Sequence, residues 1–277
     1  MRDLTDRAAT GVRQLTSAPA ALFRSGPQPE ALSFSTGAGR QVHGLLHVGP
    51  GDECARPLIV RPHPGPTANA QLRADPWIAF FTGHGFAVLE IDYSGSTGYG
   101  RRFRNSLRGQ WGELDASDCA EAVLGLADRR HIDPTRIGIH GSSAGGYTAR
   151  RALALTDLFA AAAVRHAVID PDEWRRTAPK FQAHHVDLLI APPSRAETLR
   201  RRSVVGDVDA VTAPVLIVHG ERDPVTPISQ ARRLADLMGD KASLLTFADE
   251  GHSVRRPENQ RRALDAELAH FRRALHV

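Results

Sequence analysis

The period of apolar and polar positions changes several times along the 277 residues. Between residues 32 and 48 they alternate with a period of two on either side of Gly37-Ala38-Gly39, which predicts an antiparallel hairpin. Short continuous apolar runs follow, each typical of a strand buried on both faces. These runs begin at Pro57, Phe86, Ile137, Ala160, Pro214 and Ala242.

Segments with a helical period separate most of these runs. The predicted helices cover residues 71–84, 114–130, an alanine-rich stretch after residue 143, 228–238 and 257–275. In the second of them, Cys119, Ala122 and Val123 fall on one face. Strands that alternate with helices after an opening hairpin predict an α/β fold, a mostly parallel sheet with helices on both faces. In such sheets functional residues collect in the loops beyond the carboxyl ends of the strands.

Two segments depart from this alternation. Residues 1–30 are polar and alanine-rich with apolar positions at helical spacing, and we expect a leading helix followed by a Pro/Gly linker. Residues 168–209 lie between two predicted strands without a regular period, and we expect a small lid insertion there. The predicted organisation is an N-terminal segment over 1–30 and one domain over 31–277.

Composition and charge argue against several classes of partner and cofactor. The formal charge is +4 and the pI about 9.6, but the basic residues are spread along the chain among 31 acidic ones, so we expect no nucleic-acid partner. Cys54 and Cys119 are too few for a disulfide framework or a zinc cluster, and we expect no metal and no cofactor. No apolar run approaches the roughly 20 residues that span a bilayer. Residues 1–7 lack the apolar core of a signal peptide, so we expect a cytoplasmic protein without a membrane partner.

A Gly-x-Ser-x-Gly pattern lies where a predicted strand meets a predicted helix. Ser143 occupies its centre, between Gly141 and Gly145; a pattern centred on Ser142 would need glycines at positions 140 and 144, which the chain lacks. At such a turn a nucleophilic hydroxyl stands clear of the sheet, and the amides of the helix face a developing oxyanion. The alternative interpretation is a glycine-rich turn whose serines cap the helix.

A serine hydroxyl needs an imidazole to take its proton and a carboxylate to orient that imidazole. Asp223 follows the end of one predicted strand, and His252 lies in the loop after the next strand, before the last helix. The order Ser…Asp…His is that of the α/β-hydrolase fold. Taken alone, Asp223 also suits a turn before Pro224 and His252 suits an ordinary loop. Their order after Ser143 favours a catalytic triad.

Further motifs accompany these three residues. They are Gly141-Ser-Ser-Ala-Gly-Gly-Tyr147, Gly95-Ser-Thr-Gly-Tyr-Gly-Arg101, Trp111-Gly112, His219-Gly-x-x-Asp223 and Glu250-Gly-His252. With these motifs the chain resembles, from about residue 30 to its end, the catalytic domain of the prolyl oligopeptidase (S9) family of serine peptidases. The resemblance implies that Ser143 is the nucleophile, Asp223 the orienting carboxylate and His252 the general base.

The resemblance also implies an oxyanion hole. One expected donor is the backbone N–H of Ala144, directly after the nucleophile. The second is expected from the loop after the strand that begins at Pro57. Pro64 stands there in place of a glycine that relatives often carry and has no N–H, which leaves the Gly65 amide or the His63 side chain. The alternative interpretation of this loop is a rigid turn.

Tyr147, Trp174 and Ser142 are the candidate residues of a substrate pocket. For Trp174, packing inside the lid is an equally open interpretation. Family peptidases usually carry a β-propeller ahead of the hydrolase domain. Only about 30 residues precede the predicted sheet here, so we expect no propeller and do not favour dipeptidyl-peptidase activity.

The sequence therefore predicts a serine hydrolase that cleaves an ester or amide bond of a small or short peptide-like substrate through an acyl-enzyme on Ser143. Two alternatives stay open. The same triad serves an acyltransferase, a cyclase or a thioesterase-like tailoring enzyme. The scaffold also suits a non-catalytic binding protein, because fold does not fix function. The acyl group, the leaving group and the oligomeric state do not follow from the sequence.

Overall fold

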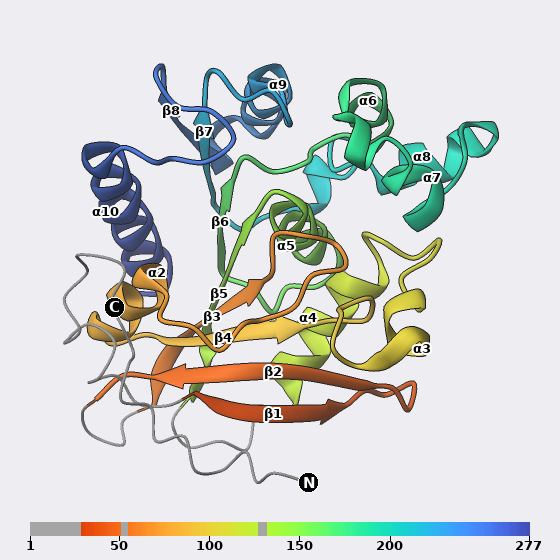
Figure 1. Cartoon of the computed structure of the whole chain (residues 1–277). Helices are drawn as coiled ribbons and strands as arrows, with labels where there is room; N and C mark the ends of the chain where they lie inside the picture. Colours follow the sequence, from red (N-terminus) through yellow and green to blue (C-terminus); the bar gives the residue numbers. More distant parts are fainter. Residues whose placement is uncertain (1–28, 51–54, 127–131) are drawn as a thin grey trace, which may run out of the picture.

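The computed structural model describes residues 29–50, 55–126 and 132–277. Across these ranges the chain forms one sheet with helices against both of its faces (Figure 1). The helix predicted within residues 1–30 lies outside the described residues, and so does Cys54.

Eight strands of the described chain form the sheet, in the order β1-β2-β4-β3-β5-β6-β7-β8. They are β1 (Glu30–Ser35), β2 (Gln41–Val48), β3 (Arg56–Pro62), β4 (Ala87–Asp92), β5 (Ile132–Ser142), β6 (Ala161–Arg165), β7 (Val215–Gly220) and β8 (Ala242–Phe247). The predicted hairpin is confirmed, since β1 and β2 pair antiparallel with Phe34 opposite Val42. β2 also runs antiparallel to β4, whereas every pairing from β4 to β8 is parallel. The predicted, mostly parallel sheet is therefore confirmed, and the carboxyl ends of its parallel strands meet at one edge.

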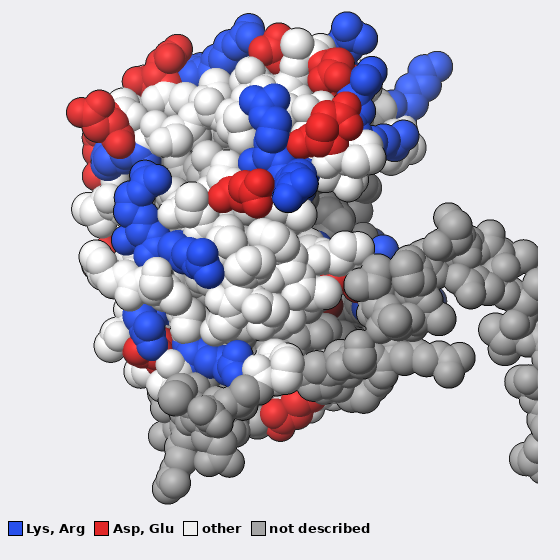
Figure 2. All heavy atoms as spheres, turned by 90° about the vertical axis from the view of Figure 1, so that its left-hand side faces the viewer, with Lys and Arg blue, Asp and Glu red and all other residues white. Residues whose placement is uncertain are grey.

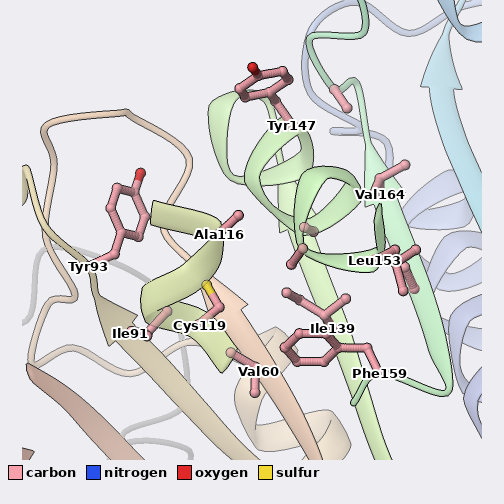
Figure 3. Packing of buried hydrophobic residues seen from close by; sticks show 14 of the residues in the cluster. Val60, Ile91, Tyr93, Ala116, Cys119, Ile139, Tyr147, Leu153, Phe159 and Val164 are labelled. Carbon is pink, nitrogen blue, oxygen red and sulfur yellow. The ribbon is translucent and has the colours of Figure 1, made fainter. Parts of the chain in front are cut away.

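Helices pack on both faces of this sheet. They are α2 (Pro76–Gly83), α3 (Gly100–Asn105), α4 (Leu114–Leu124), α5 (Ala144–Leu155), α9 (Ile228–Met238) and α10 (Pro257–Ala274), with a 3-10 turn, η4 (Gly239–Lys241), before β8. α2 and α10 share one face, where the rings of Phe81 and Phe271 meet edge to face with centroids 6.0 Å apart. α4, α5 and α9 share the other face. Figure 3 shows this second core, with Cys119 of α4 and Leu153 of α5 beside the sheet residue Ile139.

Strand β3 shows why the central strands are apolar without alternation. Leu58 and Val60 point into the core under α4 and α5, while Ile59 points into the core under α2 and α10. All three side chains are fully buried. A parallel strand covered on both faces needs an apolar residue at every position, which is the pattern seen from Pro57 onward.

Helix α2 begins later than its period predicts. The Asp75 carboxylate accepts hydrogen bonds from the N–H groups of Trp77 and Ile78, at 2.9 and 3.4 Å from Oδ1, and Pro76 occupies the first turn. A residue before proline avoids the helical region, so the helix cannot extend backward through Asp75. The prediction of helix over residues 71–75 is therefore wrong.

The connection between β6 and β7 holds the segment predicted as an irregular insertion. It contains α6 (Pro171–Thr177), η1 (Lys180–Gln182), α7 (His185–Leu189), η2 (Pro193–Arg195), α8 (Ala196–Arg202) and η3 (Val208–Ala210). In Figure 1, α6, α7 and α8 lie beyond the carboxyl end of β6. The N–H groups of Gly109 and Trp111 donate to the carbonyls of Leu188 and Leu189, at 3.3 and 2.9 Å. These bonds tie the insertion to the turn after α3.

Basic and acidic side chains are interspersed on the face of the molecule shown in Figure 2. That face lies on the side of α2 and α10 in Figure 1. No continuous basic surface of the kind that tracks a phosphate backbone is visible there.

A buried carboxylate lies beneath the carboxyl edge of the sheet. Glu267 of α10 is fully buried and accepts hydrogen bonds from Arg165 Nε at 2.5 Å, Arg165 Nη2 at 2.7 Å and Trp77 Nε1 at 2.9 Å. His140 Nε2 lies 3.3 Å from its Oε1. Burial raises the pKa of Glu267, but Arg165 and His140 outweigh burial and hold that pKa well below its usual range. The ion pair joins the last helix to the end of β6.

We expect Glu267→Gln to lower the free energy of unfolding by about 3–5 kcal/mol, because it leaves the Arg165 guanidinium without its counter-charge. The folded-state pKa of Glu267 is depressed, so its contribution is present above a pH of about 4.3, its unfolded value, and is lost as the pH falls. Denaturant unfolding at neutral pH and at about pH 3, well below the unfolded value, measures both effects.

The matched control is Glu197→Gln, which breaks the exposed pair of Glu197 with Arg200 on α8. Exposed pairs of this kind contribute about 0.5 kcal/mol or less. Equal losses in the two variants would contradict a structural role for the buried pair.

Candidate active site

Ser143 lies between β5 and α5 in a left-handed backbone conformation, with φ 53° and ψ −119°. The two flanking glycines are required by space. A Cβ on Gly141 would lie 2.1 Å from the carbonyl oxygen of Gly145, and one on Gly145 would lie 2.4 Å from that of Pro62. The Ser143 N–H donates to the carbonyl of Arg165, at 2.9 Å. This is the geometry that the Gly-x-Ser-x-Gly pattern requires of a nucleophile at a strand-to-helix turn.

The structure brings Ser143, Asp223 and His252 into one hydrogen-bonded row. His252 Nε2 lies 3.2 Å from Ser143 Oγ, and His252 Nδ1 lies 2.9 Å from Asp223 Oδ2 and 3.1 Å from Oδ1. Asp223 comes from the loop after β7 and His252 from the loop between β8 and α10. All three residues therefore lie at the carboxyl ends of strands.

The Asp223 carboxylate is held by its own loop. Its Oδ1 accepts the N–H groups of Val225 at 2.7 Å and Thr226 at 3.0 Å, and its Oδ2 accepts the Thr226 hydroxyl at 2.8 Å. His219 Nε2 lies 3.4 Å from Oδ2. Burial raises the pKa of Asp223, but hydrogen bonds from His219, His252 and the Thr226 amide outweigh burial and hold the pKa well below its usual range. Asp223 is therefore ionised at neutral pH.

The expected oxyanion donors lie on two facing loops. The Ala144 N–H points at the loop after β3 and donates to the carbonyl of Pro64, at 3.2 Å. Among the described residues, the Gly65 amide has no hydrogen-bond acceptor. Both backbone donors named by the sequence are thus present, and the Pro64 carbonyl takes the Ala144 N–H.

The His63 side chain does not suit the second donor. It is buried, with Nδ1 2.6 Å from the carbonyl oxygen of Gly65 and Nε2 2.7 Å from Ser96 Oγ. Burial lowers the pKa of His63 to about 4, so the ring is neutral and has one N–H to donate. Both ring nitrogens are engaged inside the loop. Of the two alternatives for the second donor, the Gly65 amide is the one without an acceptor among the described residues.

Two of the three candidate pocket residues belong to the protein interior. Tyr147 is fully buried, and its hydroxyl donates to the carbonyl of Arg202 at 2.8 Å. Trp174 is 2% exposed, and its Nε1 donates to the carbonyl of Val225 at 2.9 Å. These two side chains fasten the insertion to α5 and to the Asp223 loop, so they do not line an open pocket. Ser142 is half-buried at the end of β5.

Sequence reasoning missed Thr226 and His166, which also belong to this site. Thr226 touches the carboxylate of Asp223, and the ring of His166 lies against that of His252 with centroids 4.4 Å apart. Both residues follow strands, β7 and β6, so their position at the carboxyl edge was the available signal. Neither belongs to a motif that singles it out.

Within the described ranges, no group of three or more His, Cys, Asp or Glu side chains is placed to hold a metal ion. No helix there is both long enough and apolar enough to cross a bilayer.

The chain is similar to known proteins in sequence and in fold. The model of the prolyl oligopeptidase family matches residues 73–277. An uncharacterised peptidase of Bacillus subtilis (strain 168), YuxL, is 30% identical over 249 residues, which are 85% of this chain and 37% of the relative. A puromycin-hydrolysing peptidase of Mycobacterium tuberculosis superposes with a TM-score of 0.84 at 34% identity, over 89% of this chain and 39% of that one. A crystal structure of puromycin hydrolase gives a TM-score of 0.87 at 34% identity, over 96% and 42%.

The chain spans less than half the length of these relatives, between 37% and 42%.

We expect Thr226→Val to slow the labelling of Ser143 by a fluorophosphonate about ten- to a hundredfold, because the Asp223 carboxylate loses a hydroxyl donor. Thr226→Ser is the matched control, since it keeps the hydroxyl and removes only a methyl group. Equal losses in the two variants would show that the methyl packing, and not the hydrogen bond, is what the site needs.

Proposed function

Because the chain belongs to the prolyl oligopeptidase family, we propose that it is a serine hydrolase that cleaves an ester or amide bond through an acyl-enzyme on Ser143. The observation that carries this proposal is the row of hydrogen bonds from Ser143 Oγ through His252 to Asp223. A neutral imidazole within 3.2 Å of a serine hydroxyl, with an ionised carboxylate behind it, is the arrangement that makes serine a nucleophile.

In the proposed mechanism, His252 Nε2 takes the proton of Ser143 as Oγ attacks the substrate carbonyl. Asp223 accepts the His252 Nδ1–H and so fixes the tautomer and favours the imidazolium that forms. His252 then gives the proton to the leaving group. In the second half a water molecule attacks the acyl-enzyme, with His252 again acting as the base.

The negative charge that develops on the substrate oxygen is placed between Ala144 and Gly65. Their N–H groups are the donors in this proposal. The Ala144 N–H, now bonded to the Pro64 carbonyl, must exchange that oxygen for the substrate oxygen. Binding of a substrate is therefore expected to shift the loop after β3 slightly away from α5.

The proposed substrate is a small or short peptide-like molecule. Relatives named as peptidases, two of them for the hydrolysis of puromycin, favour an amide bond, while simple esters suit the same triad. The insertion over residues 168–209 is proposed as the lid of the site, within one domain over 31–277. The cytoplasmic location remains a prediction from the sequence.

Hydrolysis is favoured over acyl transfer by the exposure of the site. The His252 side chain is 27% exposed, so water reaches the proposed base. Transfer to an amine or an alcohol is favoured instead by a pocket that excludes water. The alternative of a binding protein without catalysis does not explain why Ser143, His252 and Asp223 form a row of hydrogen bonds.

We expect Ser143→Ala to abolish the hydrolysis of a p-nitrophenyl ester, by about four orders of magnitude or more, and to abolish labelling by a fluorophosphonate. Ser142→Ala is the matched control, because the neighbouring hydroxyl lies outside the row and its loss should leave labelling intact. Undiminished labelling of the Ser143 variant would show that Ser143 is not the nucleophile.

We expect the acyl group of the same ester to pass mainly to water when hydroxylamine competes as a nucleophile. The physical reason is the open access of water to His252. Product analysis by mass spectrometry separates the carboxylic acid from the hydroxamate. A product that is mostly hydroxamate at millimolar hydroxylamine would instead favour an acyltransferase.

A further inference from the structure

His166 lies beside the proposed base and has no role in the mechanism described so far. It follows β6 at the carboxyl edge of the sheet, and 9% of its surface is exposed. Its ring lies against that of His252, with centroids 4.4 Å apart and planes inclined by 56°. At this separation two aromatic rings are in direct contact. The ring of His252 is therefore in contact with a second imidazole.

The backbone of His166 is bent so that this contact forms. Its φ is 37°, and only two other non-glycine residues of the described chain, Ser143 and His276, have a positive φ. A left-handed non-glycine residue persists only where its surroundings hold it. The His166 N–H donates to the carbonyl of Val218 at 2.9 Å, and its own carbonyl lies 3.0 Å from the Thr226 hydroxyl. The Val218 carbonyl of β7 thus holds the His166 backbone, while the single proton of the Thr226 hydroxyl goes to Asp223.

The charged neighbours of the two rings are few. Asp223, His219 and Arg165 are the titratable groups that act on His166 besides His252. Burial lowers the pKa of His166 well below its usual value; His252, His219 and Arg165 act in the same direction, and Asp223 opposes them. His166 therefore stays neutral and does not compete with His252 for the serine proton. None of the described residues forms a hydrogen bond with the His166 ring, which leaves its packing as the contact that matters.

We propose that His166 is a positioning residue, whose ring packs against His252 and keeps that imidazole in the orientation joining Ser143 to Asp223. The proposal rests on the proposed function, because it gives His166 no task apart from that of His252. Without the ring, His252 is free to turn away from Ser143, and a smaller share of the enzyme is aligned for attack. Turnover falls in that case, whereas substrate binding does not.

The test uses His166→Asn and His166→Phe in the full chain, with p-nitrophenyl butyrate and a fluorophosphonate as probes. Asparagine tolerates a left-handed backbone but removes the ring, and phenylalanine keeps a ring without nitrogens. We expect the Asn variant to lose about tenfold or more in kcat and in labelling rate at a nearly unchanged KM, and the Phe variant to stay within about threefold.

A loss in kcat at an unchanged KM, rescued by phenylalanine, is the readout that a merely structural defect would not give. His276→Asn is the matched control, since His276 also has a left-handed backbone, with φ 53°, and lies after α10, away from the site. Thermal unfolding of each variant shows that the rates come from folded enzyme.

An Asn variant with wild-type kcat overturns the proposal. A Phe variant that loses as much as the Asn variant also overturns it, because the ring nitrogens would then carry the effect. If the Phe variant does not fold, the Asn variant alone decides. Failure of the proposed function has a different signature, since the wild-type enzyme would then show no labelling that depends on Ser143.

Discussion

The left-handed turn at Ser143 is the constraint on which the site depends, because a serine with φ 53° must be held in place from outside. The holding group is the carbonyl of Arg165, which accepts the Ser143 N–H at 2.9 Å. Arg165 is in turn fixed by two hydrogen bonds to Glu267 of α10. Arg165 therefore connects two parts of the structure: its side chain pairs with Glu267 of the last helix, and its carbonyl bonds to Ser143.

Two histidines approach one carboxylate at the edge of the sheet, and a third packs against one of them. His252 and His219 lie within 2.9 and 3.4 Å of Asp223 Oδ2, and His166 packs on the ring of His252. Only His252 also reaches Ser143, at 3.2 Å, so the proton of the serine has one destination. The two neighbours of His252 have different roles in this account. The Asp223 carboxylate favours the protonated imidazole that forms during attack, and the His166 ring limits the orientations open to His252.

The sequence was informative wherever a residue's place depends on strand order and backbone space. Ser143, Asp223 and His252 each follow a strand that the apolar pattern of the sequence predicts. Gly141 and Gly145 are required because the space beside each is too small for a Cβ. The sequence did not reveal that Tyr147 and Trp174 donate to the backbone carbonyls of Arg202 and Val225, because these partners lie far away in the chain. The insertion's helices are too short to show a period, so its packing could not be read in advance.

The central claim is that a substrate's acyl group becomes bonded to Ser143 Oγ. Mass spectrometry of enzyme mixed briefly with p-nitrophenyl acetate, then quenched in acid and digested with trypsin, tests this directly. The account predicts one transient acyl adduct on the peptide spanning residues 137–150, and fragmentation that assigns it to Ser143 and not to Ser142. Turnover without any adduct, or an adduct that forms on another residue at the rate of turnover, would contradict the account.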